Sequence, residues 1–552
     1  MNELRNDALK ELVKRLKVNN KYSFMKNLNY CIKAILVVLV LLFSFILESC
    51  NRQELDEINE RLDRIESEKV EKDSVNLRSF SFLSKDNLRT LISDVQGEII
   101  GDNIVECRVP YIMNDKLLIP HIDYSGTSAL LDDVEINDEM VSVDFKKPVN
   151  LTLKSENRIK TYTIYVHSFT GLPIVRIETE GRKKIETKED YIDATFVLEE
   201  NVRTRGAGDV ITTKVQVKGR GNATWKYYPK KPYRLKFQEK LSILGMPKDK
   251  SWVLLANYKD RTSLRNWMAL FISKLSKLDY TPKSKFVELF LNGEYCGTYQ
   301  LCEKIKISSN RVNVGSDGYL LEFDEYAKNE EDARCIYTKH LVHPINIKEP
   351  ECEYGDDKYE YIKDYIMSTE KALYSDNFKD PQNGWRKYLD EESLIEWYWV
   401  NEITKNLDGF RCSSTFFNKK ADGKLKIGPV WDFDHSFGNY VDNGYGSETF
   451  YGWWIRNNGW YKRLFEDESF VIAVNDRFDY YYSKKDILFE EINDYANYLQ
   501  YSVIENNAKW DTFYHPFSSD CDVWGSYFNE VGYLKKWLQN RLEWIDKVLN
   551  EN

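Results

Sequence analysis

Three acidic residues in the last third of the chain have the spacing of a phosphotransferase site: Asp408, Asp432 and Asp434. Asp408 precedes a strand–turn–strand pattern, after which Asp432 and Asp434 stand at alternate positions. This layout would place one carboxylate near a reacting group and the other two on a metal ion. Phosphoryl transfer needs such a site, because it depends on positioning and on charge neutralisation by Mg²⁺. The alternative is a surface-anchored structural protein with a well-packed acidic turn.

Basic residues that could complete a phosphate site lie about two hundred residues earlier. A strand ends in the turn Gly219-Arg220-Gly221, where glycines let backbone amides approach a phosphate. In the next strand Arg234 and Lys236 alternate with apolar residues, so both basic side chains share one face. Alone, this pattern predicts a solvated sheet face. Following a glycine turn, the two side chains could instead point at a triphosphate.

The composition of the chain limits both its architecture and its partners. The 552 residues exceed what one hydrophobic core supports, so we expect two or more domains. Aromatic residues make up 14%, too many for a disordered protein. The net charge of −10 and the mixed charge pattern give no basic face for nucleic acid. Only six histidines occur, and none are at metal-ligand spacing, which argues against a zinc hydrolase.

The N-terminus predicts export and lipidation. Residues 32–47 form an apolar run with basic residues before it, which fits a secretory signal better than a membrane-spanning helix. The run ends in Leu-Glu-Ser-Cys, which resembles the relaxed lipobox of many Bacteroidetes lipoproteins, so Cys50 would be the lipidated first residue of the mature chain. The alternative is an uncleaved signal anchor. Met25 could be the true start, which would make residues 1–24 a gene-model extension.

The remaining sequence divides into three regions. Residues 51–76 are charged and carry a short apolar seam that predicts a helical stalk, with weak self-association through 51–75. Residues 77–170 show short alternating runs that predict a small β-sandwich of Ig-like type, ending in a hairpin at 154–166. Residues 172–552 form one large α/β region, strand-rich before Phe323 and helix-rich after it. The aromatic cluster at 451–461 and the helix at 533–545 are expected to pack in its core.

The nine cysteines are scattered and include no Cys-X-X-Cys pair. Such a pattern does not indicate a disulfide framework. Cys296 and Cys302 could form a disulfide, but we favour packing as small apolar residues.

Several motifs of the large region together resemble the spore coat protein H (CotH) kinase family. They occur in the family's order over about residues 172–545, and they are Gly-Arg-Gly-Asn-Ala-Thr-Trp, Lys-Pro-Tyr-Arg-Leu-Lys-Phe, Trp-Val-Leu-Leu-Ala-Asn-Tyr-Lys-Asp, Leu-Asn-Gly-Glu-Tyr-Cys-Gly-Thr-Tyr, Glu-Lys-Ile and Trp-Asp-Phe-Asp. The resemblance implies a two-lobed α+β domain of the atypical protein-kinase type, with ATP and Mg²⁺ or Mn²⁺ as cofactors. The fold expected for the whole chain is therefore an Ig-like sandwich followed by this domain.

The resemblance also implies roles for individual residues. Asp408 would orient the acceptor hydroxyl and take its proton, Asp432 would hold the metal, and Asp434 could share it. Lys236 would contact the phosphates, with Arg234 and Arg220 as alternates, while Glu303 would lie near the adenine-binding hinge. Ordinary kinases carry an Asn five residues after the catalytic Asp, but position 413 is Ser. Ser413, Ser414 or His435 would have to replace it, or the site would use fewer ligands.

These observations leave three hypotheses for function. The first is an exported, lipid-anchored kinase of the cell envelope, which phosphorylates Ser or Thr of surface or secreted proteins. The second is a non-catalytic surface lipoprotein that uses the same fold to bind a protein or glycan. The third is transfer of AMP rather than phosphate.

Overall fold

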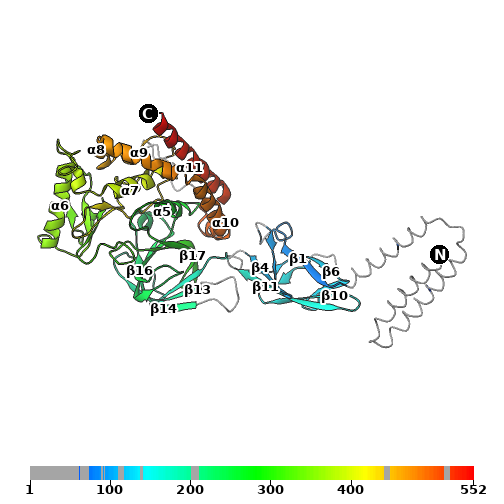
Figure 1. Ribbon diagram of the computed structural model, residues 1–552. Helices are drawn as coiled ribbons and strands as arrows, with labels where there is room; N and C mark the ends of the chain where they lie inside the picture. The colour runs from blue at the N-terminus through cyan, green and yellow to red at the C-terminus, as the bar shows by residue number, and fades with distance from the viewer. Residues whose placement is uncertain are drawn as a thin grey trace, which may run out of the picture. The chain divides into compact units, whose positions relative to one another are not determined.

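The computed structural model describes residues 36, 61, 74–88, 91, 94–109, 117–136, 141–168, 170–199, 210–439, 448–514 and 522–551. Cys50 and nearly all of the predicted signal and stalk lie outside these residues. The chain divides into two compact units, and the second takes in Val166–Asn552 with residues 83–95 and 107–118 (Figure 1). In the described part of the chain, no helix is long and apolar enough to cross a membrane.

Among the described residues between 74 and 168, the regular elements are all β-strands. Its sheets have the orders β2-β1-β6, β3-β4-β11-β10-β7-β8 and β5-β9. The predicted hairpin at 154–166 is confirmed, because β10 and β11 pair antiparallel around a short turn. The Ig-like assignment stays a prediction. The strands are β1 (Asn76–Phe82), β2 (Val95–Gln96), β3 (Glu98–Ile100), β4 (Ile104–Val109), β5 (Leu117–Leu118), β6 (His121–Ser125), β7 (Ser128–Leu131), β8 (Val134–Glu135), β9 (Val143–Asp144), β10 (Val149–Lys154) and β11 (Ile159–Ser168).

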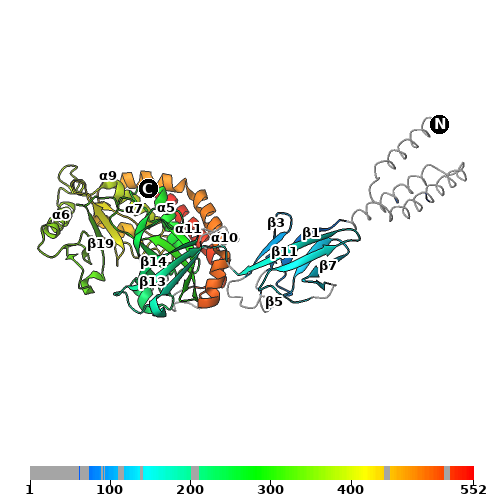
Figure 2. The same ribbon diagram turned by 90° about the horizontal axis from the view of Figure 1, so that it is seen from below.

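The second unit contains a closed barrel, whose strands have the order β12-β13-β14-β15-β16-β18-β17 (Figure 2). Its neighbours are antiparallel except β12 and β17, which run parallel and close it. The predicted Asn292-Gly293 hairpin turn is confirmed, with a positive φ at both residues. The strands are β12 (Ile174–Thr179), β13 (Ile192–Glu199), β14 (Val210–Gly219), β15 (Tyr233–Leu241), β16 (Asp249–Leu255), β17 (Ser284–Leu291) and β18 (Glu294–Glu303), and the short helix α4 (Ala223–Tyr227) lies between β14 and β15.

Alternation along the barrel strands separates an apolar interior from an outer face. Val215 and Val217 of β14 and Leu235 and Phe237 of β15 fill the interior core. The residues that alternate with them therefore point outward, as the sequence pattern predicted for Arg234 and Lys236. β14 ends at the Gly-Arg-Gly turn and its last residue, Gly219, pairs with the first residue of β15, Tyr233, so the turn lies near the outward Arg234.

The rest of the second unit joins a second sheet to several helices (Figure 1). The sheet order is β20-β21-β19-β22-β23, and β22 with β23 form the predicted strand–turn–strand after Asp408. Helix α10 lies against β18, and α5, α7, α9 and α11 pack together. The bounds are β19 (Tyr319–Phe323), β20 (Cys335–Ile336), β21 (Ile345–Glu349), β22 (Thr415–Lys419), β23 (Lys426–Ile427), α5 (Arg265–Leu275), α6 (Asp357–Leu373), α7 (Glu391–Ile403), α8 (Tyr461–Leu464), α9 (Glu468–Tyr482), α10 (Lys485–Trp510) and α11 (Tyr527–Asn550).

The structure bears on three sequence expectations about packing. Trp460 and Tyr461 of the aromatic cluster are fully buried and Trp453 and Trp454 pack against the core, whereas Tyr451 of the same cluster is exposed. Helix α11 buries the apolar stripe that the sequence showed. Cys296 and Cys302 are both free thiols on β18, so the packing interpretation holds. The chain is thus a multidomain protein of mixed α and β structure.

Candidate functional site

Three carboxylates from two separate segments of the second unit lie together. Asp408 belongs to the loop after α7, whereas Asp432 and Asp434 follow β23. One carboxylate oxygen of each residue lies within 4.8 Å of the others, and all three residues are half-buried. Like charges repel strongly where the surroundings exclude water. The arrangement therefore favours a bound cation.

The loop that carries Asp408 is fixed by neighbouring polar groups. The Asn406 side chain donates to Asn401 Oδ1 at 3.0 Å and accepts from the Asp408 amide at 3.3 Å. The Leu407 amide donates to the His435 carbonyl at 3.2 Å. The last of these bonds ties the loop directly to the segment that carries the other two carboxylates.

The segment Asp432–Asp434 has an irregular backbone. An extended segment would turn both carboxylates the same way, but Asp432 adopts a left-handed conformation with a φ of 66°. The side chain of Phe433 between them is buried, and its amide donates to Asn266 Oδ1 at 2.8 Å. The two carboxylates still reach Asp408, so a buried aromatic anchor and a local turn replace the expected extended geometry.

His435 links the acidic cluster to a half-buried lysine. Its Nδ1 lies 3.5 Å from Asp408 Oδ2, and its Nε2 is in hydrogen-bond contact with Lys259 Nζ. Burial opposes the charged form of Lys259, but Asp434 and other nearby groups outweigh burial and raise the lysine pKa. Burial likewise opposes the charged form of His435, and Asp408 with Asp434 raises the histidine pKa above its ordinary value. A charged imidazole and an ammonium group are both donors, so this hydrogen bond forms only while one of the two is neutral, and the carboxylates favour the charged form of each.

The carboxylates themselves differ in their affinity for protons. Burial would raise the pKa of Asp408, but His435 and Lys259 outweigh it and hold that pKa below the ordinary value. Burial raises the pKa of Asp432 to about 7, with Asp434 and Asp408 adding to the effect and Arg220 opposing it. Asp432 is therefore the carboxylate whose ionisation a bound cation would favour most. Hard oxygen ligands of this kind suit Mg²⁺ or Mn²⁺.

A narrow cavity opens beside the cluster. Its volume is about 40 Å³, far below the roughly 300 Å³ or more of common small-molecule sites. A nucleotide would therefore fit only after the surrounding side chains move apart. The residues that line the cavity are Arg220, Thr224, Pro232, Leu255, Ala256, Asn257, Tyr258, Lys259, Asn266, Trp431, Asp432 and Asp434.

The structure brings only some of the predicted phosphate- and nucleotide-binding residues to this cavity. Arg220 lines it, whereas Arg234, Lys236 and Glu303 do not. Lys236 is exposed on β15, with its Nζ 5.8 Å from the centre of the Tyr191 ring. Glu303 is fully buried and accepts from the Tyr280 hydroxyl and the Lys283 amide, both at 2.9 Å. Its contacts are those of a residue that fixes the end of β18.

The main residue that sequence reasoning missed is Lys259. It lies in the Ala-Asn-Tyr-Lys-Asp motif that carried part of the family resemblance, but nothing in the spacing showed that it would approach Asp408. Asn257 and Asn266 also line the cavity, and the Asn266 amide donates to Asn257 Oδ1 at 3.2 Å. Of the candidates for the missing Asn, Ser414 has a direct contact, since its hydroxyl donates to Asp432 Oδ2 at 3.3 Å.

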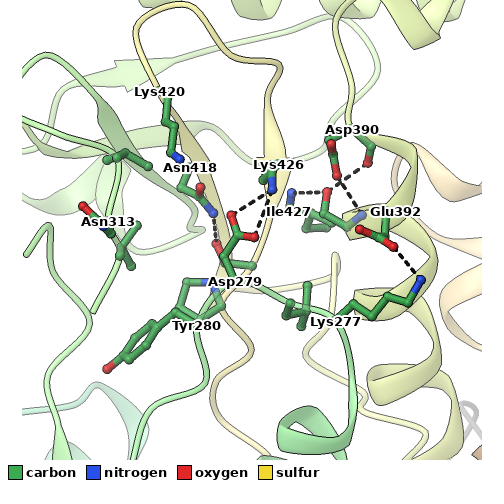
Figure 3. A pocket seen from close by; sticks show the side chains of 16 residues that line it. Lys277, Asp279, Tyr280, Asn313, Asp390, Glu392, Asn418, Lys420, Lys426 and Ile427 are labelled. Carbon is green, nitrogen blue, oxygen red and sulfur yellow. Dashed lines mark hydrogen bonds and ion pairs between the residues drawn. The ribbon is translucent and has the colours of Figure 1, made fainter. Parts of the chain in front are cut away.

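A larger cavity of about 310 Å³ lies at the other end of α7 (Figure 3). Asp390 caps that end of the helix, and Asp408 follows the opposite end, about 20 Å away along 13 residues. Two of its lysines are already paired, Lys277 with Glu392 at 2.7 Å and Lys426 with Asp279 at 2.8 Å. Most of the charge in this cavity is therefore neutralised by the protein itself.

Comparisons with known proteins point to one family. The family model described as CotH kinase protein matches residues 215–545, and no curated protein matches the chain. A solved DUF4623 family protein from Bacteroides eggerthii is 10% identical with a TM-score of 0.14, and the match covers 32% of this chain and 49% of that one. A proposed glycoside hydrolase from Bacteroides thetaiotaomicron is 15% identical with a TM-score of 0.15, covering 53% and 87%. The chain spans about half the length of the first structure, and similarity this low carries no argument.

Proposed function

Because the chain belongs to the CotH kinase protein family, we propose that it is an exported protein kinase that transfers the γ-phosphate of ATP to Ser or Thr of surface or secreted proteins. The observation that carries this proposal is the convergence of Asp408, Asp432 and Asp434 beside the half-buried Lys259. Phosphoryl transfer requires a metal site, a group that orients the acceptor, and cations around the phosphates. All three requirements have candidates within one small region of the second unit.

Each residue of the cluster has a distinct proposed role. Asp432 and Asp434 hold Mg²⁺ or Mn²⁺, with the Ser414 hydroxyl bonded to Asp432. The bound metal supplies positive charge that neutralises the phosphate oxygens. Asp408, kept ionised by its surroundings, accepts the hydrogen bond of the acceptor hydroxyl and later its proton. His435 fixes the orientation of Asp408 through the contact at 3.5 Å.

Two cations are placed to contact the phosphates. Lys259 and Arg220 both line the cavity beside Asp432 and Asp434. The aromatic ring of Trp431 lies 5.9 Å from the Arg220 guanidinium at the same cavity. We assign Lys259 the role that the sequence gave to Lys236, because it shares the cavity with the carboxylates and Lys236 does not.

The remaining parts of the proposal concern the roles of the domains and the location of the protein. We propose that the helical and barrel parts act as the two lobes of a kinase-like domain, and that residues 77–170 are an Ig-like spacer. Lipidation at Cys50 would then hold the protein on the cell envelope, at the outer membrane or cell surface. Support comes from the sequence of residues 32–50 and from the all-β structure of the N-terminal region.

Two observations favour a second candidate function. The cavity of about 40 Å³ is too small for a nucleotide as it stands, and position 413 lacks the expected Asn. Both fit a non-catalytic surface lipoprotein that binds a protein or glycan with the same scaffold.

Autophosphorylation with γ-labelled ATP and Mg²⁺ or Mn²⁺ tests the kinase proposal. We expect labelling of the wild type and loss of at least about 99% of it in Asp408→Asn and Asp432→Asn, since each removes a group that acts in the transition state. The exposed Asp422→Asn, in the turn between β22 and β23, is the matched control and should label normally. Equal labelling in all variants would contradict the assignment. Intact mass after reaction distinguishes addition of phosphate from addition of AMP.

A further inference from the structure

The outer face of the barrel beside the acidic cluster carries a group of positive charges. Lys218 and Arg234 alternate with residues of the barrel core and therefore point outward, and the register pairs them directly across β14 and β15. Arg220 follows β14, and Lys304 follows β18. We call these four residues, Lys218, Arg220, Arg234 and Lys304, the basic face.

The cations of the basic face repel one another. Burial lowers the pKa of Lys218, and the Arg234 guanidinium lowers it further. Burial and then Arg234 lower the pKa of Lys304 to about 7. Burial also lowers the pKa of Arg220, where Arg234 adds to the effect and Asp432 opposes it. Like charges opposite each other weaken a sheet, so the free protein keeps an unfavourable arrangement at this place.

Three of these cations are half-buried and lack a counter-charge. Arg541 shows the usual arrangement, since it is fully buried and pairs with the Glu402 carboxylate at 2.7 Å. Charges buried without a counter-charge are unfavourable and rare. Within the described ranges, no carboxylate oxygen lies within the 4.0 Å ion-pair distance of Arg220, Arg234 or Lys304.

Two polar atoms at the basic face also lack hydrogen-bond partners. Neither Arg234 Nε nor the Tyr191 hydroxyl has one among the residues that the structure describes, although both atoms are buried. The Tyr191 ring stands beside the basic face, with Lys218 Nζ 4.7 Å and Arg234 Cζ 5.9 Å from its centre. Buried donors without a partner are rare in folded proteins. A ligand with several acceptor oxygens could satisfy such groups.

We propose that the basic face is a second oxyanion site, which binds a phosphate group next to the acidic cluster through Arg234 and Lys304. A phosphate monoester carries a charge of about −1.5 to −2 and three strong acceptor oxygens. The arginine offers a planar fork of donors and the lysine a compact charge, which together suit this ligand. Arg220 lines the nucleotide cavity, but Arg234 and Lys304 do not. The bound phosphate would therefore lie beside that cavity.

Phosphate at this site could come from two sources. It could be the end of the polyphosphate chain of ATP, or a phosphorylated side chain of the acceptor protein. The second source rests on the proposed kinase function and would give the enzyme a preference for acceptors that already carry phosphate. Binding of phosphate itself requires no activity, so it can be tested separately.

Thermal unfolding with increasing inorganic phosphate, at constant ionic strength, tests the site. We expect saturable stabilisation of the wild type, with an apparent affinity at least about tenfold weaker in Arg234→Gln and in Lys304→Gln, since each removes a charge-assisted hydrogen bond. Both variants should unfold at the same or a higher temperature than the wild type without phosphate, because they relieve repulsion. If these residues only support the fold, both variants should unfold at a lower temperature than the wild type without phosphate.

The control separates a specific site from the general effect of phosphate. Phosphate is excluded from protein surfaces and stabilises most proteins without saturation. Lys214→Gln removes an exposed lysine of the same strand, β14, and should respond to phosphate as the wild type does. If wild type, Arg234→Gln, Lys304→Gln and Lys214→Gln all respond alike, the proposal is wrong.

Two further measurements identify the source of the phosphate. If Arg234→Gln weakens binding of ATP and leaves binding of native casein unchanged, the site serves the nucleotide. If it removes a preference for native over dephosphorylated casein, the site serves the acceptor. Asp432→Asn should retain phosphate binding, so a protein that never autophosphorylates but still binds phosphate through Arg234 would support the site and contradict the kinase proposal.

Discussion

Lys259 and His435 meet at the acidic cluster although 176 positions separate them in the sequence. Together they surround Asp408 with positive charge, which explains how a half-buried carboxylate stays ionised beside two others. The ordinary alternative for three crowded carboxylates is protonation of one of them. At the scale of single residues, Lys259 and His435 therefore neutralise part of the negative charge of the three carboxylates, and a metal ion would neutralise the rest.

Exchange of single lysines separates the two candidates for phosphate contact. Lys259→Met should lower the initial rate of autophosphorylation at least about tenfold, because it removes a half-buried cation from the carboxylates and the phosphates. Lys236→Met should change the rate less than about twofold, because the lysine is exposed on β15 outside the cavity. Initial rates at saturating ATP measure both. The reverse order of effects would restore Lys236 as the phosphate-contacting residue.

The sequence predicted the acidic members of the site and missed their basic partner for a physical reason. Asp408, Asp432 and Asp434 stand in two short segments, so local turns largely decide their positions. The approach of Lys259 depends on how the turn after β16 packs against the segment after β23, which no local pattern records. Arg234 and Lys236 were placed on the correct face of their strand, but the pattern could not show where the cavity would open.

At the scale of elements, α11 holds the C-terminal end of α7, the helix that precedes Asp408. Arg541 of α11 donates to the Glu402 carbonyl at 2.8 Å and to its carboxylate at 2.7 Å. The same guanidinium donates to the carbonyls of Phe450 and Gly452 at 2.8 and 2.7 Å. One buried ion pair thus joins α11, the last turn of α7 and the loop at 450–452.

Removal of the Arg541–Glu402 ion pair should strongly destabilise the protein. Arg541→Met should lower the free energy of unfolding by about 3–5 kcal/mol, because it leaves the fully buried Glu402 without a counter-charge. Lys277→Gln, which breaks an exposed pair with Glu392, should cost less than about 1 kcal/mol. Urea denaturation measures both values. Similar losses in the two variants would show that α11 does not depend on this pair.

Elements defined by local sequence were predicted better than their assembly. The Asn292-Gly293 turn requires a positive φ at two successive residues, and few sequences other than Asn-Gly permit it. The apolar stripe of α11 repeats at helical spacing and can likewise be recognised from the sequence. By contrast, β12 pairs in parallel with β17, more than a hundred residues later, and closes the barrel. Such long-range pairing has no local signal, so the sequence indicated a strand-rich half and not a closed barrel.

At the scale of the whole second unit, a buried lysine joins the barrel to the helices. Lys230, 1% exposed, donates to Asn506 Oδ1 of α10 at 2.7 Å and to the Thr298 carbonyl of β18. Its Nζ lies 4.6 Å from the centre of the Tyr299 ring. Burial lowers the pKa of Lys230 to about 7, although Glu288 opposes this effect. The contact between barrel and helices therefore contains a group that titrates near neutral pH.

This group should make the stability of the unit depend on pH. The ordinary lysine pKa is about 10.4, so between about pH 7 and that value the unfolded chain binds a proton that the folded protein lacks. Stability should then rise with pH over this range and level off below about pH 7, with a slope of at most about 1.4 kcal/mol per pH unit from this residue. Lys304 and Lys405, whose pKa values burial lowers to about 7 and about 8, act in the same direction.

The comparison between variants isolates the contribution of Lys230. Lys230→Met should be less stable overall, because it leaves the Asn506 and Thr298 oxygens without their donor, but its stability should rise less steeply with pH. Denaturation at about pH 7.5 and about pH 8.5 should show a difference in slope of about 1 kcal/mol per pH unit, because the other titrating groups, Cys296 included, are present in both proteins. The exposed Lys214→Met should keep the wild-type slope. Parallel slopes for wild type and Lys230→Met would mean that Lys230 stays charged in the folded protein, held by Glu288 more strongly than burial opposes it.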